Sequence, residues 1–422
     1  MSVQADFIVR NCSEIVTPVG TTALRGAEAR RVRRIEGGAL AAYEGILVAV
    51  GPEPEVLRSL QRAPGAVELD ARGASVIPGF VDPHTHAVFG RARAGDYVAR
   101  LEGKTYAEIA AAGGGIHSSV RDLRAHSEAE LVELAVPRLG RMLQHGTTTV
   151  EIKTGYGLTP ADELKVLGAI QALRRRVPQE LVATFLGAHE IPLEYRARRA
   201  EYVQLVIEQM IPQAAPLAEF NDVFCEPSVF TLAESEAILR AGLAHGLVPK
   251  LHADELEPYG AAELACRLGA VSADHLMYVS DAGVRALAAS DTVAVLLPAT
   301  TFGLASTQWA PARRLLDAGA AVALATDFNP GSSYCESMQA VWSLACSMLR
   351  MTPDEALVAA TLNSAAAVGR ARRTGSLEPG KRCDLALLRC SDYREVPYHF
   401  GVNNVHSVVV DGRVAWTDPG GG

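Results

Sequence analysis

Two histidines separated by a single residue, directly after an apolar run, are the strongest chemical signal in this sequence. The run Ala74–Val81 continues into Asp82-Pro83-His84-Thr85-His86. Side chains at positions i and i+2 of an extended segment point to the same side, so the imidazoles of His84 and His86 can share one ion. Imidazole ligands suit zinc or non-haem iron better than calcium or magnesium alone. The motif therefore predicts a metal centre.

Other residues of metal-ligand type follow further apolar runs. They are His252, His275 and Asp327, and Glu255 lies three residues beyond His252. A lone buried histidine is more often structural than a ligand, but here four run ends agree. We predict that His84, His86, His252 and Asp327 bind the metal. The histidines that follow no such run are predicted to be structural or at the surface: His117, His126, His145, His245, His399 and His406.

A barrel of parallel strands would position these residues, because the active site of such a barrel lies at the carboxyl ends of its strands. Amphipathic segments such as Pro160–Arg175 and Leu232–Ala244 separate the apolar runs, which is typical of a parallel sheet covered on both sides. Eight runs predict a closed (β/α)₈ TIM-like barrel. They are Ala74–Val81, Thr147–Ile152, Leu181–Gly187, Asp222–Cys225, Leu247–Leu251, Ala270–Ala273, Thr292–Leu297 and Ala321–Ala325.

Both ends of the chain differ from this pattern. Residues 1–72 hold short strand-like pieces with glycine turns, and residues 375–422 begin with a turn-rich connector and include a hairpin-like Asp411-Gly412. We predict that 1–72 and 375–422 together form one small β-sandwich domain. Residues 73–374 are then the barrel domain.

Composition excludes several functional classes. The chain has 422 residues, is 49% hydrophobic and 21% charged, and carries a net charge of −8, which fits a globular protein with a large core. With no long basic block or apolar span, binding to nucleic acid or to a membrane is not expected. Seven cysteines without paired spacing indicate a reducing compartment, so we expect a cytoplasmic protein.

The run Gly113-Gly114-Gly115 is not a phosphate-binding loop. It follows a helix-like stretch rather than a strand, and no Gly-Lys-Ser/Thr comes after it. We expect a helix stop or a mobile loop near the pocket mouth.

The arrangement of ligands resembles the amidohydrolase superfamily. Binuclear members carry a carboxylated lysine after strand four, whereas this chain has Phe224-Cys225-Glu226 there, which favours one metal ion. Within the superfamily the chain resembles the imidazolonepropionase family over nearly its whole length. The matching stretches are Pro78–His86, Thr105–Ile116, Lys153–Gly157, Phe185–His189, Lys250–Glu255, Ala325–Ser333 and Tyr398–Asn403.

This resemblance implies a substrate, a cofactor and a set of contacts. The implied reaction is hydrolytic ring opening of 4-imidazolone-5-propanoate, a small anionic heterocycle, to N-formimidoyl-L-glutamate, with one Zn²⁺ or Fe ion per subunit and a homodimer as the assembly. Glu255 and His275 are implied as the acid–base pair, with Asp327 able to share the proton transfer. The implied substrate contacts are Arg93, Tyr156, His189, Glu255, Asn329, Gly331 and Ser332.

Several alternatives stay open at this stage. Arg91 competes with Arg93 for the substrate carboxylate, and the spacing of Tyr156 fits packing equally well. His₃Asp accepts either zinc or iron. Another mononuclear amidohydrolase, such as a cyclic-amide hydrolase or a nucleobase-type deaminase, would use the same ligands. A non-catalytic scaffold is disfavoured, because every ligand and both acid–base candidates are present.

Overall fold

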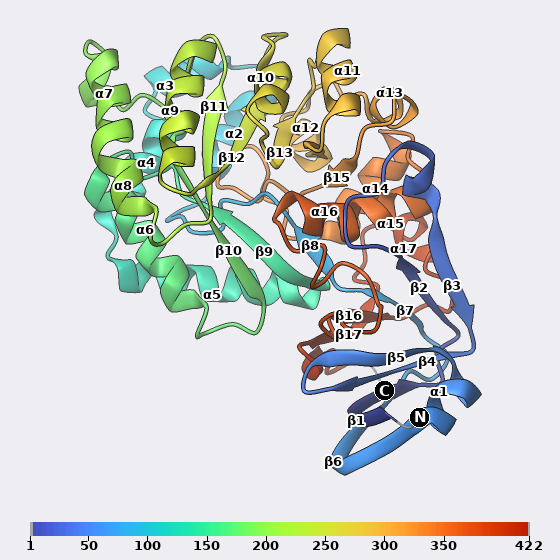
Figure 1. Cartoon of the computed structure of the whole chain (residues 1–422). Coiled ribbons are helices and arrows are strands. Elements are labelled where there is room, and N and C mark those ends of the chain that lie inside the picture. The colour runs from blue at the N-terminus through green and yellow to red at the C-terminus, as the bar shows by residue number, and fades with distance from the viewer. Residues whose placement is uncertain (1–2, 421–422) are drawn as a thin grey trace.

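Eight parallel strands form the central barrel of the protein, as the sequence predicts. The computed structural model describes residues 3–420, without the side chains at positions 106, 107 and 110. The strands pair in chain order, each with its neighbours (Figure 1). They are β8 (Phe80–Asp82), β9 (Thr147–Lys153), β10 (Glu180–Ala188), β11 (Phe220–Cys225), β12 (Val248–Ala253), β13 (Ser272–His275), β14 (Val293–Leu296) and β15 (Val322–Leu324).

The first and last strands meet through the residues that follow them. Thr85 and Phe328 form a parallel bridge. The Asp327 N–H donates to the His84 carbonyl at 3.0 Å, and the His86 N–H donates to the Phe328 carbonyl at 2.8 Å. The segments that carry three of the predicted metal ligands are therefore hydrogen-bonded to each other where the barrel closes.

Helices cover the outside of the barrel (Figure 1). α5, α9 and α15 each begin with a capping box, in which Ser or Thr and a Glu three residues later satisfy each other's backbone N–H groups. The longer helices are α2 (Ala94–Leu101), α4 (Ile116–Ala125), α5 (Glu128–Gln144), α6 (Pro160–Leu173), α9 (Leu232–Ala244), α11 (Asp281–Ala289), α14 (Met338–Ser347) and α15 (Pro353–Ala360). The shorter ones are α3 (Tyr106–Ala111), α7 (Arg199–Leu205), α8 (Ile211–Ala214), α10 (Ala261–Arg267), α12 (Pro298–Gly303), α13 (Ala312–Asp317), α16 (Leu362–Ala367) and α17 (Glu395–Tyr398). A further short helix, α1 (Glu53–Ser59), lies away from the barrel among the strands of the chain ends (Figure 1).

Two further sheets come from the chain ends and lie together beside the barrel, with both termini among them (Figure 1). The four-stranded sheet contains β1 (Val3–Arg10), β4 (Gly38–Tyr43), β5 (Ile46–Pro52) and β6 (Leu60–Asp70). The six-stranded sheet contains β2 (Glu14–Pro18), β3 (Val32–Glu36), β7 (Ser75–Pro78), β16 (Leu385–Leu388), β17 (Val405–Val410) and β18 (Arg413–Thr417). Buried side chains of both sheets share one apolar cluster, as in a sandwich.

The run Ala74–Val81, predicted as a single barrel strand, is divided in the structure. β7 pairs with β2 and β16 in the six-stranded sheet, and only β8 pairs with the barrel strand β9. Gly79 separates the two strands, and a Cβ there would lie 2.3 Å from the Thr148 hydroxyl. The prediction of one strand was therefore wrong, because burial of both pieces gives them the same apolar pattern. The domain limits at residues 72 and 374 stay predictions.

The triple glycine ends one helix and begins another, which is the helix-stop role expected of it. Gly113 follows α3 with φ +90°, and Gly115 precedes α4 with φ +70°. The backbone of this run is also held by Asp96, whose carboxylate accepts the Gly115 N–H at 2.9 Å. Within residues 3–420, no helix is both long and apolar enough to cross a membrane.

Gly79→Ala should destabilise the protein, because the added methyl group has no space beside Thr148. We expect a loss of about 1–3 kcal/mol in the free energy of unfolding, measured by chemical denaturation. Gly140→Ala is the matched control: it lies inside α5, where a Cβ meets nothing within 4 Å. That control should be neutral or stabilising. Equal stability of the two variants would show that Gly79 is not needed for the strand division.

Candidate metal and active site

Four predicted ligands and two further histidines gather at the carboxyl ends of the barrel strands. The ring centroids of His84 and His252 are 4.5 Å apart, and those of His252 and His275 are 5.1 Å apart. His86 lies 5.5 Å from His84 by the same measure. Asp327 Oδ1 lies 3.5 Å from His84 Nε2 and 3.7 Å from His86 Nε2. All of these side chains are buried.

The donor set fits a metal ion. Three overlapping groups place their ligand atoms within 4.8 Å of one another: His84 with His252 and His275, His86 with His189 and His252, and His84 with His86 and Asp327. Among the described residues, the buried Nε2 atoms of His84 and His275 have no hydrogen-bond partner. Burial lowers the pKa of His84, His86 and His275 well below the usual range, which keeps these imidazoles neutral and able to coordinate.

Two buried carboxylates lie beside imidazole nitrogens of the cluster, one in a hydrogen bond and one in an ion pair. Asp274 Oδ2 lies 2.6 Å from His84 Nδ1, and Asp222 Oδ2 lies 3.1 Å from His252 Nδ1. An Nδ1–H that donates to a carboxylate leaves the Nε2 lone pair free for a metal. Asp222 lies on β11, next to the strand β12 that carries His252. Asp274 lies on β13, across the barrel from His84, which follows β8.

A buried lysine holds these carboxylates in turn. Lys153 Nζ lies 2.8 Å from Asp222 Oδ2, 2.8 Å from Glu151 Oε1 and 3.6 Å from Asp274 Oδ2, and all four side chains are inaccessible to solvent. Burial alone would lower the pKa of Lys153, but the carboxylates of Asp222 and Glu151 raise it overall, so the ammonium stays charged. A second buried lysine, Lys250, lies 3.5 Å from Glu151.

Sequence reasoning missed this network of Glu151, Lys153, Asp222, Lys250 and Asp274, although the signal was present. Each residue interrupts an otherwise apolar strand, and a charged residue in such a strand must be paired inside the barrel. Glu151 and Lys153 also show the i, i+2 spacing that puts two side chains on one face of a strand.

Glu255 and His275 lie together beside the histidine cluster. Glu255 Oε2 is 3.5 Å from His275 Nε2. Burial, and after it the charge of Asp327, raises the pKa of Glu255 to about 8. Glu226, which follows strand four of the barrel, accepts hydrogen bonds from the N–H groups of Glu255 at 2.6 Å and Leu256 at 3.1 Å. It thereby fixes the backbone that carries Glu255.

The two candidate arginines differ sharply in burial. Arg91 leaves 86% of its side chain exposed and lies beside Asp122, whereas Arg93 leaves 15% exposed. The Arg93 N–H donates to the Pro330 carbonyl at 2.8 Å, and its guanidinium packs so closely on Gly331 that a Cβ there would meet Nη2 at 1.5 Å. The charge of Arg93 is also among the influences that lower the pKa of His189, after burial and His252. Arg93 is thus the arginine that faces the site.

Asp96 connects Arg93 to the triple glycine. Its Oδ2 atom lies 3.3 Å from Arg93 Nε and accepts the Gly115 N–H at 2.9 Å. A Cβ at Gly114 would lie 2.5 Å from Asp96 Oδ1, so this close approach requires glycine. Ser119 adds a hydroxyl 3.1 Å from Arg93 Nη1.

Tyr156 and His189 form one wall next to the metal cluster. His189 stacks on His86 with ring centroids 5.0 Å apart and an angle of 13° between the planes. Its Nδ1 lies 2.9 Å from the Gly155 carbonyl, and burial lowers its pKa to about 3. The Tyr156 ring lies 5.5 Å from that of His86 and 5.3 Å from that of His189. A substrate role for the pair stays a prediction.

The turn after Asp327 is held by Asn329. Its Oδ1 accepts the N–H groups of Gly331 and Ser332, both at 2.8 Å, and its Nδ2 donates to the Asp327 carbonyl and to the Ser332 hydroxyl. These donors, predicted to contact the substrate, are engaged within the turn, and their contact with the substrate stays a prediction. Thr300 donates to Asp327 Oδ2 at 2.6 Å, which leaves Oδ1 facing the histidines.

Comparison with known proteins identifies relatives along nearly the whole chain. The family model of the amidohydrolase family matches residues 75–415. Imidazolonepropionase from Symbiobacterium thermophilum is 50% identical over 412 residues, which cover 97% of this chain and 97% of the relative. Imidazolonepropionase from Geobacillus thermodenitrificans is 48% identical over 413 residues, again 97% of each chain.

Solved structures share the fold at much lower identity. An adenosine deaminase from Xanthomonas campestris with bound zinc superposes with a TM-score of 0.69 at 20% identity, covering 98% of this chain and 93% of the other. Guanine deaminase from E. coli gives a TM-score of 0.71 at 15% identity, covering 97% of this chain and 99% of the other. These likenesses show the fold alone.

Lys153→Met should weaken metal binding, although Lys153 is no predicted ligand. Without the ammonium, the crowded carboxylates take up a proton and lose their hold on the imidazole N–H groups. We expect metal affinity to fall about 10–100-fold, measured by competition with a chelator. His252→Ala is the positive control and should retain little metal by elemental analysis. Lys165→Met, in α6, is the matched negative control, because this partly buried lysine is paired with Asp162 and not with the carboxylates of the site. Unchanged affinity in Lys153→Met would show that the lysine does not support the metal site.

Proposed function

The chain belongs to the amidohydrolase family and, within it, to the imidazolonepropionases, and on this basis we propose how its residues hydrolyse 4-imidazolone-5-propanoate to N-formimidoyl-L-glutamate. One observation carries the proposal: a cluster of buried imidazoles fit for a metal lies near a nearly buried arginine, Arg93, whose charge acts on His189. The first feature supports hydrolysis of a ring amide. The second supports a substrate with an acidic tail. No observation favours a deaminase or another cyclic-amide hydrolase.

His84, His86, His252 and Asp327 are the residues we propose to hold one zinc or iron ion. When bound, the ion supplies a Lewis acid that lowers the pKa of water and polarises a carbonyl group. The chain's own part is to present imidazole nitrogens, with Asp274 hydrogen-bonded to His84 and Asp222 ion-paired with His252. Thr300 holds one Asp327 oxygen and thereby directs the other toward His84 and His86.

Glu255 is the proton carrier of the proposed mechanism. Water adds to the ring carbonyl carbon, the carbon–nitrogen bond of the cyclic amide breaks, and one proton passes from the water to the leaving nitrogen. A carboxyl whose pKa is raised to about 8 can accept and return a proton near neutral pH. His275, 3.5 Å from Glu255, is placed to donate to the oxygen that gains negative charge or to share the proton.

Arg93 is the proposed clamp for the propanoate. Its guanidinium presents a planar fork that matches a carboxylate, and Asp96 and Ser119 fix its direction. Tyr156 and His189 would then bound the heterocycle between the clamp and the metal. Asn329, Gly331 and Ser332 would contact the same ligand only after rearrangement of the hydrogen bonds within their turn.

The cellular setting is a proposal too. All seven cysteines are free, and burial raises the pKa of several of them, Cys12 and Cys225 among them, which suits a reducing compartment such as the cytoplasm. We propose a small anionic heterocycle as the sole ligand class of the active site, and the homodimer stays a prediction.

Turnover of the proposed substrate tests the function directly. The metal-loaded protein is given 4-imidazolone-5-propanoate, generated in situ from urocanate, and loss of substrate absorbance is followed. Glu255→Gln should lower kcat about 10²–10⁴-fold. Because Glu255 is no proposed ligand, its metal content should match that of the wild type. Absence of turnover by the metal-replete wild type would overturn the function, and near-normal kcat in Glu255→Gln would overturn the proton role.

Arg93→Ala should mainly raise KM, by about 10–100-fold, because a charge-assisted bond to the carboxylate is lost. A substrate analogue without the carboxylate should be hardly affected by the change. Arg91→Ala removes the same charge two residues away from an exposed side chain, and it should leave KM unchanged. Equal losses on substrate and analogue would show that Arg93 does not recognise the tail.

A further inference from the structure

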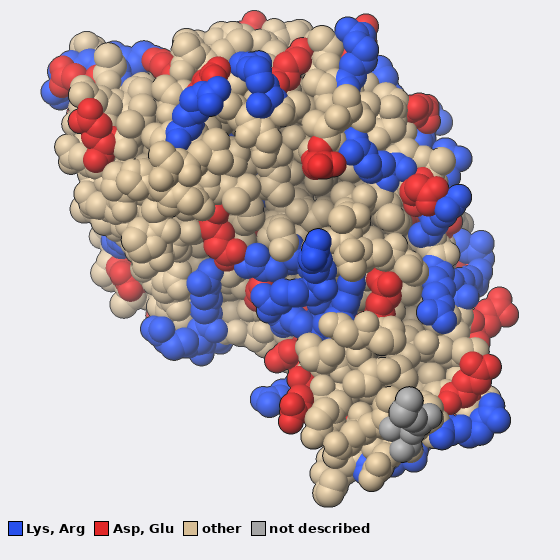
Figure 2. Space-filling view, viewed as in Figure 1, with Lys and Arg blue, Asp and Glu red and all other residues tan. Residues whose placement is uncertain are grey.

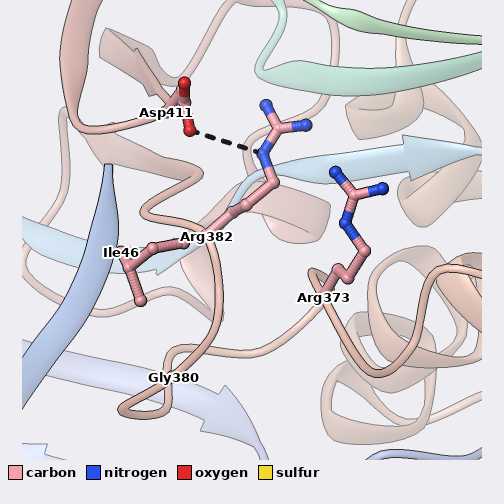
Figure 3. A pocket seen from close by; sticks show the side chains of 5 residues that line it. All are labelled: Ile46, Arg373, Gly380, Arg382 and Asp411. Atoms are coloured by element: carbon pink, nitrogen blue, oxygen red, sulfur yellow. Dashed lines mark ion pairs between the residues drawn. The ribbon is translucent and has the colours of Figure 1, made fainter. Parts of the chain in front are cut away.

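A basic cavity lies where the connector after the barrel meets the two end sheets. It measures about 260 Å³ and is lined by Ile46, Arg373, Gly380, Arg382 and Asp411 (Figure 3). Ile46 begins β5, residues 373–382 precede β16, and Asp411 lies in the turn between β17 and β18. None of these residues belongs to the histidine cluster, so the cavity is a separate feature of the molecule.

The backbone holds the two arginines side by side. The Arg382 N–H donates to the Arg373 carbonyl at 2.8 Å. On the other side of the connector, the Leu47 N–H donates to the Lys381 carbonyl and the Gly380 N–H to the Leu47 carbonyl, both at 2.8 Å. The two guanidinium groups are thus neighbours on fixed backbone (Figure 3). A ligand that binds both guanidinium groups therefore causes only a small loss of conformational entropy.

Acidic partners engage Arg382 closely but Arg373 only weakly. Glu180 is shared: its oxygens lie 2.6 Å from Arg370 Nε and 2.5 Å from Arg382 Nη1, but 3.7 Å from the nearest nitrogen of Arg373. Among the described residues, Arg373 has no other acidic group within 4 Å, and 60% of its side chain is exposed. Buried Arg382 Nε has no hydrogen bond within the described chain, although carboxylate oxygens of Asp384 and Asp411 lie 3.4 Å and 3.8 Å from it.

The surrounding surface is also basic. Lysine and arginine side chains gather between the barrel and the end sheets, over the region of this cavity (Figure 2). The chain as a whole carries a net charge of −8, so this concentration runs against the overall balance. A local excess of positive charge raises the concentration of small anions near it.

We propose that this cavity binds a small oxyanion of the phosphate class. Two guanidinium forks can donate paired N–H groups to a tetrahedral oxyanion, and the negative charge removes the repulsion between them. The volume admits inorganic phosphate or a short phosphate ester. Because the lining comes from β5, the connector and the β17–β18 turn, the bound anion joins segments of both end sheets to the chain that leaves the barrel. Binding therefore stabilises the fold, independently of hydrolysis.

The test titrates inorganic phosphate, and separately ethyl phosphate, into the metal-loaded protein by calorimetry and thermal melting. Ionic strength is held constant with chloride, so general screening cancels. Phosphate should bind in the millimolar range and raise the melting temperature. Arg373→Ala should weaken binding by about tenfold. Asp411→Asn removes the acidic group of the lining and keeps a residue that tolerates its φ of +51°, so it should tighten binding.

Two matched variants make the outcome decisive. Arg176→Ala removes an equal charge from an arginine that is paired with Glu133 and is not among the lining residues, and phosphate affinity should not change. Arg93→Ala reports binding at the catalytic site, and affinity should again persist. Equal affinity in Arg373→Ala and Arg176→Ala would overturn the proposal. So would loss of binding only in Arg93→Ala, or no effect of phosphate beyond that of chloride. Tighter binding of ethyl phosphate than of phosphate would identify an ester as the preferred ligand.

Discussion

The ion pairs of Lys153 inside the barrel are the interaction on which the site depends. A lysine and three carboxylates without access to solvent are stable only as a group, because each charge alone would carry a large desolvation cost. Of those carboxylates, Asp274 is also hydrogen-bonded to His84, and Asp222 is ion-paired with His252. The same carboxylates therefore balance the charge of Lys153 and contact the predicted metal ligands.

Closure of the barrel supplies the second constraint. His84, His86 and Asp327 belong to opposite ends of the strand order, and they meet because their backbones are hydrogen-bonded at the seam. The same closing segment continues into the Asn329 turn, against which Arg93 packs through Gly331. The metal cluster and the proposed carboxylate clamp are consequently held at a fixed relation by a few short backbone contacts.

The end sheets are linked to the barrel by more than chain connectivity. β7 belongs to the six-stranded sheet and runs into β8 of the barrel across a single glycine, so the strand that begins the site also begins in the sandwich. On the return, Arg370 and Arg382 bind Glu180 at the start of β10. The proposed anion cavity lies at this junction. Backbone hydrogen bonds hold the connector there, and a bound anion would balance the positive charge of its arginines.

The sequence by itself determined the barrel, the sandwich from both ends, and the ligand types at the strand ends. These follow from local facts: apolar periodicity, the i, i+2 rule and the polarity of the residues that end each run. Sequence could not show that the run Ala74–Val81 divides between two sheets, because both pieces are buried and look alike. Nor could it pair Lys153 with Asp222 and Asp274, or show that Arg93 is mostly buried and Arg91 exposed. Those outcomes are contacts between residues far apart in the chain, and only closure of the barrel decides which of them meet.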